Sequence, residues 1–353
     1  MPANNPFSLM YGRIPTSFIR RTEEFKRILT TFQSDSPSTL AYTITGIRGA
    51  GKTVLLRAVA KELQDESDFL VVDLNPQEEM ISSFGQKLFY EGKKDKLFLD
   101  FQLTIDLKYL QLDISKNEKI SNPEVIGERL IKDAARKKKK ILITIDEVNN
   151  TPDMKKFANF YQSMVGKGYD VFLLMTGLKN NIDVLVSSSA TSFLSRTPKI
   201  SLRPLDLVEI VSEYRKTLSV SVEMASSLAR LTKGYAFAYQ VLGYFFFESK
   251  DKRIDDDLLS QYDEYLRKNG YDVIWNELTG KEKDFCLALF QSENQEASEI
   301  MKIAKMKESN YQNYRSSLIN KGLIQPTDHG KVGFALPRFE KFIEANLVYY
   351  MED

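Results

Sequence analysis

Short apolar runs recur along the first 180 residues, and most are rich in the β-branched residues that favour strands. Runs of this length, separated by longer stretches of helical pattern, predict buried strands of a parallel sheet. We predict such strands over 39–44, 69–76, 141–145 and 170–177. The segment 97–110 alternates apolar and polar positions instead, which predicts an antiparallel insertion outside the sheet core.

The stretch after the first predicted strand has the period of an amphipathic helix. Apolar residues stand at positions 54, 55, 58, 59 and 63, which places them on one face of a helix over 53–64. Strands that alternate with helices indicate an α/β fold with a parallel sheet flanked by helices.

The turn between this strand and this helix reads GIRGAGKT, residues 46–53, and fits the phosphate-binding pattern G-x-x-x-x-G-K-[ST]. Glycines let backbone N–H groups wrap phosphates, and the helix N-terminus adds the positive end of its dipole. A plain glycine turn before a helix is the alternative. We predict that Lys52 contacts the β- and γ-phosphates and that Thr53 ligates Mg²⁺. The full predicted nucleotide contact set in this turn is Gly46, Arg48, Gly49, Ala50, Gly51, Lys52, Thr53 and Val54.

A carboxylate is expected at the end of a second buried strand, and the run KILITIDEV supplies one. Asp146 follows the apolar residues 141–145, at the strand end where α/β sheets place their ligands, and we assign it to Mg²⁺. Glu147 comes next and is the candidate that polarises an attacking water, unless it is a surface carboxylate. Thr176 ends the strand 170–177, where it either contacts a γ-phosphate or water or merely caps the strand.

Composition narrows the class of protein. With 42% hydrophobic and 27% charged residues the chain is globular, and its net charge of +1 means that nucleic-acid affinity requires a local patch. The single cysteine, Cys286, excludes an intramolecular disulfide, and the single histidine, His329, leaves too few ligands for a His/Cys zinc site. The first 13 residues lack signal-peptide features, and no apolar run approaches the ~20 residues of a membrane span. We expect a cytoplasmic protein with no membrane partner.

These motifs resemble AAA+ ATPases of the origin-recognition, or initiator, type, within the bacterial and archaeal group that shares features with STAND signalling ATPases. The segment 14–25, IPTSFIRRTEEF, is similar to the family box whose backbone clamps adenine, with Ile19 and Arg21 at the aliphatic and arginine positions and Arg20 replacing a glycine. The resemblance implies that Ile19 and Arg21 contact the nucleotide. The phosphate loop and the run ITIDEV are also close to the family forms.

Two later segments extend the resemblance. The segment 192–206 is similar to the family's arginine-bearing stretch before a short strand and the lid, which implies an arginine-finger role for Arg196, with Arg203 a weaker candidate. A surface cation is the alternative for Arg196. The segment 232–248 resembles the lid motif, but Ala236 stands where the family has proline, and no arginine follows it there. The missing sensor arginine favours the STAND-like side of the group.

The C-terminal third predicts helices over 279–291, 297–306 and 307–322, the last capped by Ser309 or Asn310 and ended by Gly322. A hairpin around 328–330 and a closing helix complete a winged helix-turn-helix, which the resemblance also implies. Residues 301–341 contain eight basic and three acidic side chains, a local charge of +5, and Asn310, Gln312, Asn313 and Arg315 are types that read base edges. Duplex DNA is one predicted partner, and protein docking is the alternative.

The sequence therefore predicts an ATP-binding, slowly hydrolysing ATPase that uses Mg²⁺ and acts as a switch. Its expected domains are an ATPase core over 1–203, a helical lid over 204–272 and a winged helix over 273–353. One hypothesis places it on DNA; the other makes it a STAND-type signalling ATPase that docks an unidentified protein partner. An arginine finger usually acts on a neighbouring subunit, so a homo-oligomer is also expected.

Overall fold

The chain forms two compact units in the computed structural model, which describes residues 4–10, 12, 14–94, 97–98, 102–106, 109–115 and 118–350. The sheet unit comprises residues 20–45 and 52–202. The helical unit comprises residues 1–19, 46–51 and 203–353.

Five parallel strands form the central sheet of the sheet unit, in the order β2-β6-β7-β1-β8. The strands are β1 (Ala41–Thr45), β2 (Phe69–Leu74), β6 (Lys140–Ile145), β7 (Val171–Gly177) and β8 (Lys199–Ser201). β1 and β7 are buried along their whole length and β6 from its second residue, as continuous apolar runs require in a sheet covered on both faces. The four predicted strands and the short strand implied after residue 192 are confirmed.

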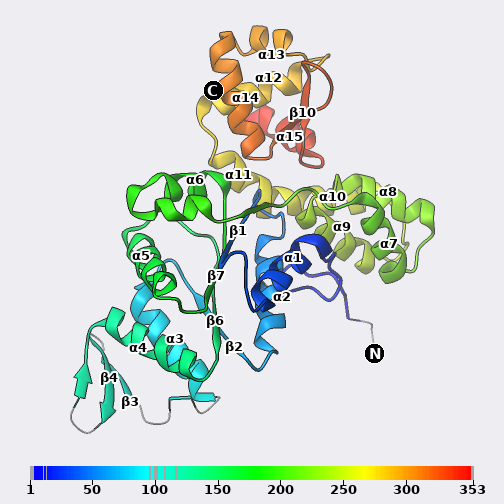
Figure 1. Ribbon diagram of the computed structural model, residues 1–353. Coiled ribbons are helices and arrows are strands. Elements are labelled where there is room, and N and C mark those ends of the chain that lie inside the picture. The colour runs from blue at the N-terminus through cyan, green and yellow to red at the C-terminus, as the bar shows by residue number, and fades with distance from the viewer. Residues whose placement is uncertain are drawn as a thin grey trace. The chain divides into compact units, whose positions relative to one another are not determined.

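Helices cover both faces of this sheet. α1 and α2 pack on one face, and α3, α4 and α5 pack on the other (Figure 1). The second face encloses a core of aliphatic and aromatic side chains that includes Phe84, Leu130 and Phe157. The helices of the unit are α1 (Thr22–Gln33), α2 (Lys52–Gln64), α3 (Met80–Lys94), α4 (Pro123–Arg136), α5 (Pro152–Gly166), α6 (Lys179–Ser187) and a 3₁₀ helix (Ser189–Arg196).

The predicted antiparallel insertion is present as a separate sheet. β3 (Gln102–Asp106), β4 (Tyr109–Ser115) and β5 (Glu118–Ile120) pair antiparallel in chain order. Residues 99–101 and 107–108 of the predicted segment 97–110 lie outside the described residues. The period of two in this segment therefore identified strands that do not belong to the parallel sheet.

The helical unit is built around one core that holds many aromatic rings, among them Tyr214, Tyr239, Phe285 and Phe339. Phe7, from the N-terminal segment, packs its ring against Tyr214 and Tyr239. The helices are α7 (Leu207–Leu218), α8 (Val222–Thr232), α9 (Ala236–Glu248), α10 (Asp256–Leu266), a π-helix (Arg267–Tyr271), α11 (Asp272–Asn276), α12 (Gly280–Gln291), α13 (Ala297–Ile303), α14 (Glu308–Asn320) and α15 (Phe339–Tyr350).

The C-terminal elements follow the predicted order, with two differences at helix ends. α13 stops at Ile303, earlier than predicted, because Lys305 adopts a left-handed conformation with φ +50°. α14 begins at Glu308 after Lys307, whose side chain makes no capping bond, so the prediction of a Ser309 or Asn310 cap is wrong. Both lie inside the first turn of the helix instead.

The other end of α14 agrees with the prediction. Gly322 adopts φ +68°, and the N–H groups of Gly322 and Leu323 donate to the carbonyls of Ile319 and Leu318. This pair of bonds is the Schellman motif, in which a left-handed glycine closes a helix. β9 (Ile324–Pro326) and β10 (Val332–Phe334) then pair as an antiparallel hairpin.

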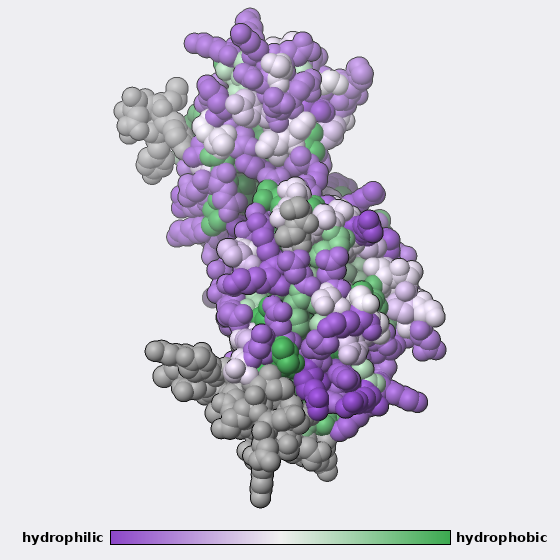
Figure 2. All heavy atoms as spheres, turned by 60° about the vertical axis from the view of Figure 1, so that its left-hand side comes forward, coloured by the Kyte–Doolittle hydropathy of each residue, from purple (hydrophilic) through white to green (hydrophobic). Residues whose placement is uncertain are grey.

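Figure 2 shows one face of the molecule, on which hydrophilic residues predominate and hydrophobic ones occur in small, scattered groups. Within the described residues, no helix combines the length and the hydropathy that a membrane span requires.

Candidate nucleotide site

The start of α2 and the end of β6 are joined by a hydrogen bond. Thr53, the second residue of α2, donates its hydroxyl to Asp146 Oδ2 at 2.8 Å. Lys52, the first residue of α2, is buried next to Thr53 in the chain. The predicted Lys-Thr pair and the predicted strand-end carboxylate therefore occupy one corner of the sheet unit.

Thr176 completes this arrangement from β7, the strand next to β6. Its buried hydroxyl donates to Asp146 Oδ1 and accepts the N–H of Glu147 at 3.0 Å, while its carbonyl accepts the N–H of Val148 at 2.8 Å. Both oxygens of the Asp146 carboxylate thus accept a hydroxyl, one from α2 and one from β7. The geometry makes Thr176 a support for Asp146 and for the backbone after β6.

Glu147 has an unusual backbone at the end of β6. Its φ is +56°, in the left-handed region that residues with a side chain seldom adopt, and its side chain is exposed. Such a conformation costs free energy and persists where surrounding bonds hold it, as the bond from its N–H to Thr176 does here. The two consecutive carboxylates therefore have different surroundings: Asp146 accepts hydrogen bonds from two hydroxyls, whereas the side chain of Glu147 is exposed.

The glycine-rich turn, residues 46–51, belongs to the helical unit, where Tyr235, just before α9, and Phe237, within α9, bond its tip. Tyr235 donates its hydroxyl to the carbonyl of Arg48 at 2.9 Å, and the N–H of Phe237 donates to the carbonyl of Gly49 at 3.1 Å. Arg48 also forms an ion pair with Glu277 at 2.7 Å. The sequence did not single out Tyr235, Phe237 or Glu277: the first two lie in the segment that resembles the lid motif, but nothing in the sequence pairs any of the three with the turn.

The other predicted site residues are divided between the two units. Ile19 is partly buried against the core of the helical unit, and Arg21 precedes α1 in the sheet unit. Val54 continues the first turn of α2. Arg196 ends the 3₁₀ helix and is exposed, and its guanidinium has no ion-pair or hydrogen-bond partner among the described residues. Arg203 is exposed in the helical unit.

The donor set at the Thr53–Asp146 corner suits Mg²⁺. A hydroxyl and a carboxylate are hard oxygen ligands, and Mg²⁺ commonly binds one or two such groups together with waters and substrate phosphates. Across the part of the chain that the structure describes, no three His, Cys, Asp or Glu side chains gather in a way that could hold a metal ion. A metal here would therefore depend on ligands that a nucleotide and water supply.

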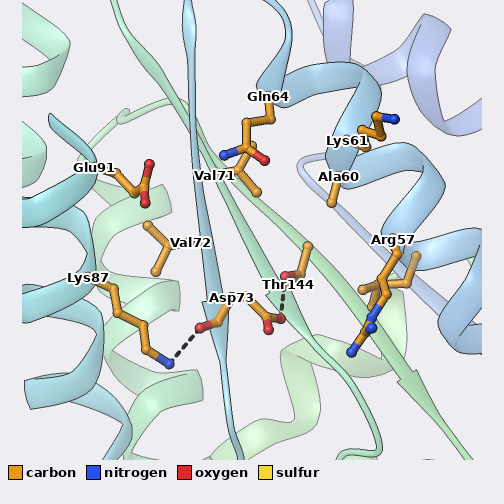
Figure 3. Close-up of a pocket in the computed structure, with 11 residues that line it drawn as sticks. Arg57, Ala60, Lys61, Gln64, Val71, Val72, Asp73, Lys87, Glu91 and Thr144 are labelled. Carbon is orange, nitrogen blue, oxygen red and sulfur yellow. Dashed lines mark hydrogen bonds between the residues drawn. The ribbon is translucent and has the colours of Figure 1, made fainter. Parts of the chain in front are cut away.

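A hollow of about 460 Å³ lies elsewhere in the sheet unit, lined by residues of α2, β2, α3 and β6 (Figure 3). Three of its polar residues bond one another: Thr144 donates to Asp73 Oδ1 at 2.8 Å, and Lys87 donates to the Asp73 carbonyl at 2.9 Å. None of the predicted nucleotide contacts lines it. The hollow is therefore separate from the predicted site and suggests no ligand of its own.

Comparisons with known proteins agree with this geometry. A family model described as an ATPase domain predominantly from Archaea matches residues 18–219, and a model for a domain of unknown function matches residues 268–343. A comparison with the curated proteins finds no match.

Two solved structures share the fold over nearly the whole chain. The ORC2 protein of Aeropyrum pernix, in its ADPNP–ADP complexes, is 11% identical with a TM-score of 0.64, and 98% of each chain is covered. Cdc6p of Pyrobaculum aerophilum is 14% identical with a TM-score of 0.53, and 97% of each chain is covered. At these identities the likeness concerns the fold, and it bears out the resemblance to initiator-type AAA+ proteins.

Replacing Thr176 with valine tests the support of Asp146. The change keeps the shape of the side chain but removes the hydroxyl that bonds Asp146 and the Glu147 N–H. We expect the affinity for ATP in the presence of Mg²⁺ to fall roughly tenfold or more, since losing a partner of a metal ligand typically has that effect. Affinity measured by calorimetry with EDTA in place of Mg²⁺ should change less than about twofold.

Thr191→Val is the matched control, because Thr191 is also buried in the sheet unit and its hydroxyl also bonds the chain, at the Leu185 carbonyl. If both variants bind ATP with Mg²⁺ equally well, Thr176 has no special role at the site.

Proposed function

Because the chain belongs to the family of ATPase domains found predominantly in Archaea, we propose that it is an ATP-controlled switch that acts on duplex DNA. The observation that carries the proposal is the hydrogen-bonded corner in which Thr53, Asp146 and Thr176 meet beside the buried Lys52. Lys52 and Thr53 are the first two residues of α2 and directly follow the glycine-rich turn. In P-loop proteins such a turn and the N-terminus of the helix after it bind phosphates together.

In the proposed complex the turn 46–51 and the start of α2 hold the phosphates. Lys52 neutralises charge on the β- and γ-phosphates, and Ile19 and Arg21 contact the base side, as the family resemblance implies. Thr53 and Asp146 would hold Mg²⁺, which would offset the negative charge of the phosphates. Thr176 keeps the Asp146 carboxylate oriented for this role.

We further propose slow hydrolysis that depends on a second copy of the chain. Glu147 would orient the attacking water molecule; its side chain is exposed at the end of β6, and its neighbour Asp146 accepts hydrogen bonds from two hydroxyls. The exposed guanidinium of Arg196 is available to a neighbouring subunit, where it would stabilise charge in the transition state. Turnover would then require self-association.

Steady-state ATPase measurements over a wide range of enzyme concentration test this step. Wild-type specific activity should rise with concentration. Glu147→Gln should bind ATP within about twofold of wild type yet turn it over about a hundredfold more slowly, the scale of lost general-base assistance. Arg196→Ala should also retain ATP binding and lose at least about tenfold in turnover.

Arg203→Ala is the comparison for Arg196, since both arginines are exposed and precede α7. A constant specific activity together with a fully active Arg196→Ala variant would remove the proposed finger. Loss of activity only in Arg203→Ala would move the role to that residue.

For the C-terminal segment 273–353 we propose a winged helix, preceded by a lid over 204–272 and a core over 1–203. α12, α13 and α14 followed by the β9–β10 hairpin have the order of that domain. α14 would be the recognition helix, and it exposes Asn310, Gln312 and Asn313, side chains that can bond base edges.

Within residues 301–341, ion pairing leaves the unpaired basic side chains close together in the chain. Four of the eight basic residues in this range are paired: Lys321 with Glu282, Lys331 with Glu296, Arg338 with Asp263 and Lys341 with Glu344. The other four have no ion pair among the described residues, and they lie in the end of α13, the turn and α14. These four are Lys302, Lys305, Lys307 and Arg315.

This distribution supports a contact between the α13–α14 turn and the phosphate backbone. Replacing Lys302, Lys305 and Lys307 together with alanine should weaken duplex binding at least about tenfold at low salt. It should also reduce the slope of log affinity against log salt by about one for each lysine. Filter binding across salt concentrations, with and without ATP, measures both quantities.

The matched control replaces Lys250, Lys268 and Lys281, which also lie in the helical unit and are exposed, so that the net charge changes equally. Equal loss in the two triple variants would indicate a general charge effect. Wild-type protein that binds no duplex under any condition would favour the protein-docking hypothesis over DNA.

A further inference from the structure

Two carbonyls of the phosphate-binding turn, those of Arg48 and Gly49, accept hydrogen bonds from outside the turn, and both donors belong to the start of α9. The phenol of Tyr235 bonds the Arg48 carbonyl, and the N–H of Phe237 bonds the Gly49 carbonyl. Tyr235 is the residue that precedes α9, and Phe237 is the second residue of the helix. Two successive peptide groups at the tip of the turn are thereby fixed by one helix end.

This contact also serves the helix. The first N–H groups of any α-helix lack partners within it, and a side chain of the preceding residue commonly caps one of them. Tyr235 makes no such capping bond. The Gly49 carbonyl accepts the N–H of Phe237 instead. The turn therefore caps α9 at the N–H of Phe237, while the start of α9 orients the turn.

Gly49 leaves no space for the turn to shift toward α9. Its φ is +74°, and a Cβ atom built there would lie 2.3 Å from Tyr235 Oη and 2.9 Å from Phe237 Cβ. The Tyr235 ring is itself buried in the core of the helical unit, and this burial raises the pKa of its phenol, so the hydroxyl keeps its proton. A rigid, permanently protonated donor thus lies against the backbone at Gly49.

Because the peptide bond is planar, a bond that fixes a carbonyl also fixes the direction of the N–H group of the same peptide. In a trans peptide the carbonyl and the following N–H point in opposite directions. When Tyr235 holds the Arg48 carbonyl, it directs the N–H of Gly49 to the other side of the turn, away from α9. Phosphate-binding turns bind their ligand with backbone N–H groups of this kind.

We infer that Tyr235 is a positioning residue for the phosphate-binding turn, which acts through the Arg48 carbonyl and not by contact with the nucleotide. The inference rests on the proposed ATP site and adds to it a determinant of phosphate affinity from α9. The ion pair of Arg48 with Glu277 holds the same residue, but its partners are 40% and 48% exposed, so water screens it. The buried phenol is therefore the contact to test.

Tyr235→Phe removes only the hydroxyl and leaves the ring in the core. Loss of one neutral hydrogen bond that orients the turn should weaken the binding of both ATP and ADP by about three- to tenfold. Adenosine has no phosphates, so its affinity, measured by competition, should not change. Calorimetry with full-length protein gives the nucleotide affinities, and urea unfolding gives the stability of each variant.

Tyr262→Phe is the matched control. Tyr262 is a buried tyrosine of the same unit, and its hydroxyl donates to a backbone carbonyl, that of Leu231, at 3.1 Å. It should lose comparable stability and bind ATP and ADP as wild type does. Equal weakening in both variants, or weakening of adenosine as much as of ATP, would show a structural effect and overturn the inference.

Binding measurements on the wild type and on Tyr235→Phe distinguish a failure of the positioning role from a failure of the proposed function. Wild-type protein that binds ATP, with Tyr235→Phe binding it equally well, overturns the positioning role alone. Wild-type protein that binds no nucleotide overturns the proposed function and the positioning role together.

Discussion

Two hydroxyl groups hold the Asp146 carboxylate, one donated by Thr53 at the start of α2 and one by Thr176 at the end of β7. β6, β7 and β1 are neighbours in the sheet, and parallel strands bring their carboxyl ends to one edge. The carboxylate is thus the point at which the start of α2, the helix after β1, meets the ends of β6 and β7. The lengths of these strands and the first residue of α2 together determine the positions of Thr53, Asp146 and Thr176.

The second constraint is the pairing of charge within the fold. Glu282 is buried, and it accepts bonds from Lys321, Ser317 and Thr279, which ties α12 to α14. Burial opposes the ionised form of Glu282, but these bonds outweigh it and lower the pKa of the carboxyl. Lys321 is therefore part of the structure and is not available to a ligand. A count of charges along a segment therefore overstates the number of basic side chains that can bind a ligand. In residues 301–341 the unpaired lysines of the α13–α14 turn are the ones that can.

The sheet strands and the phosphate-binding motif were predictable because their signals are local. An apolar run identifies a buried strand, and Gly46, Lys52 and Thr53 serve one chemistry at fixed spacing. The hydrogen bond from Tyr235 to the Arg48 carbonyl was not predictable, since 187 residues separate the two and neither residue type requires the other as a partner. The same holds for Thr176, whose position at a strand end was clear but whose hydroxyl partners depend on the register of β7 beside β6. The start of α14 was misplaced because Ser309 and Asn310 are good caps by type, and nothing local marks Lys307 as the boundary.

The proposed switch, its hydrolysis and the role of Tyr235 all require that the turn 46–51 and the start of α2 bind ATP. Calorimetric titration of ATP with Mg²⁺ into wild type, Lys52→Ala and Lys61→Ala tests it most directly, since both lysines lie on α2 and Lys61 is exposed and outside the motif. The account predicts that wild type and Lys61→Ala bind ATP alike. Lys52→Ala should bind at least about a hundredfold more weakly, because the phosphates lose the cation that the motif supplies. Equal affinity in wild type and Lys52→Ala would contradict the assignment of the site.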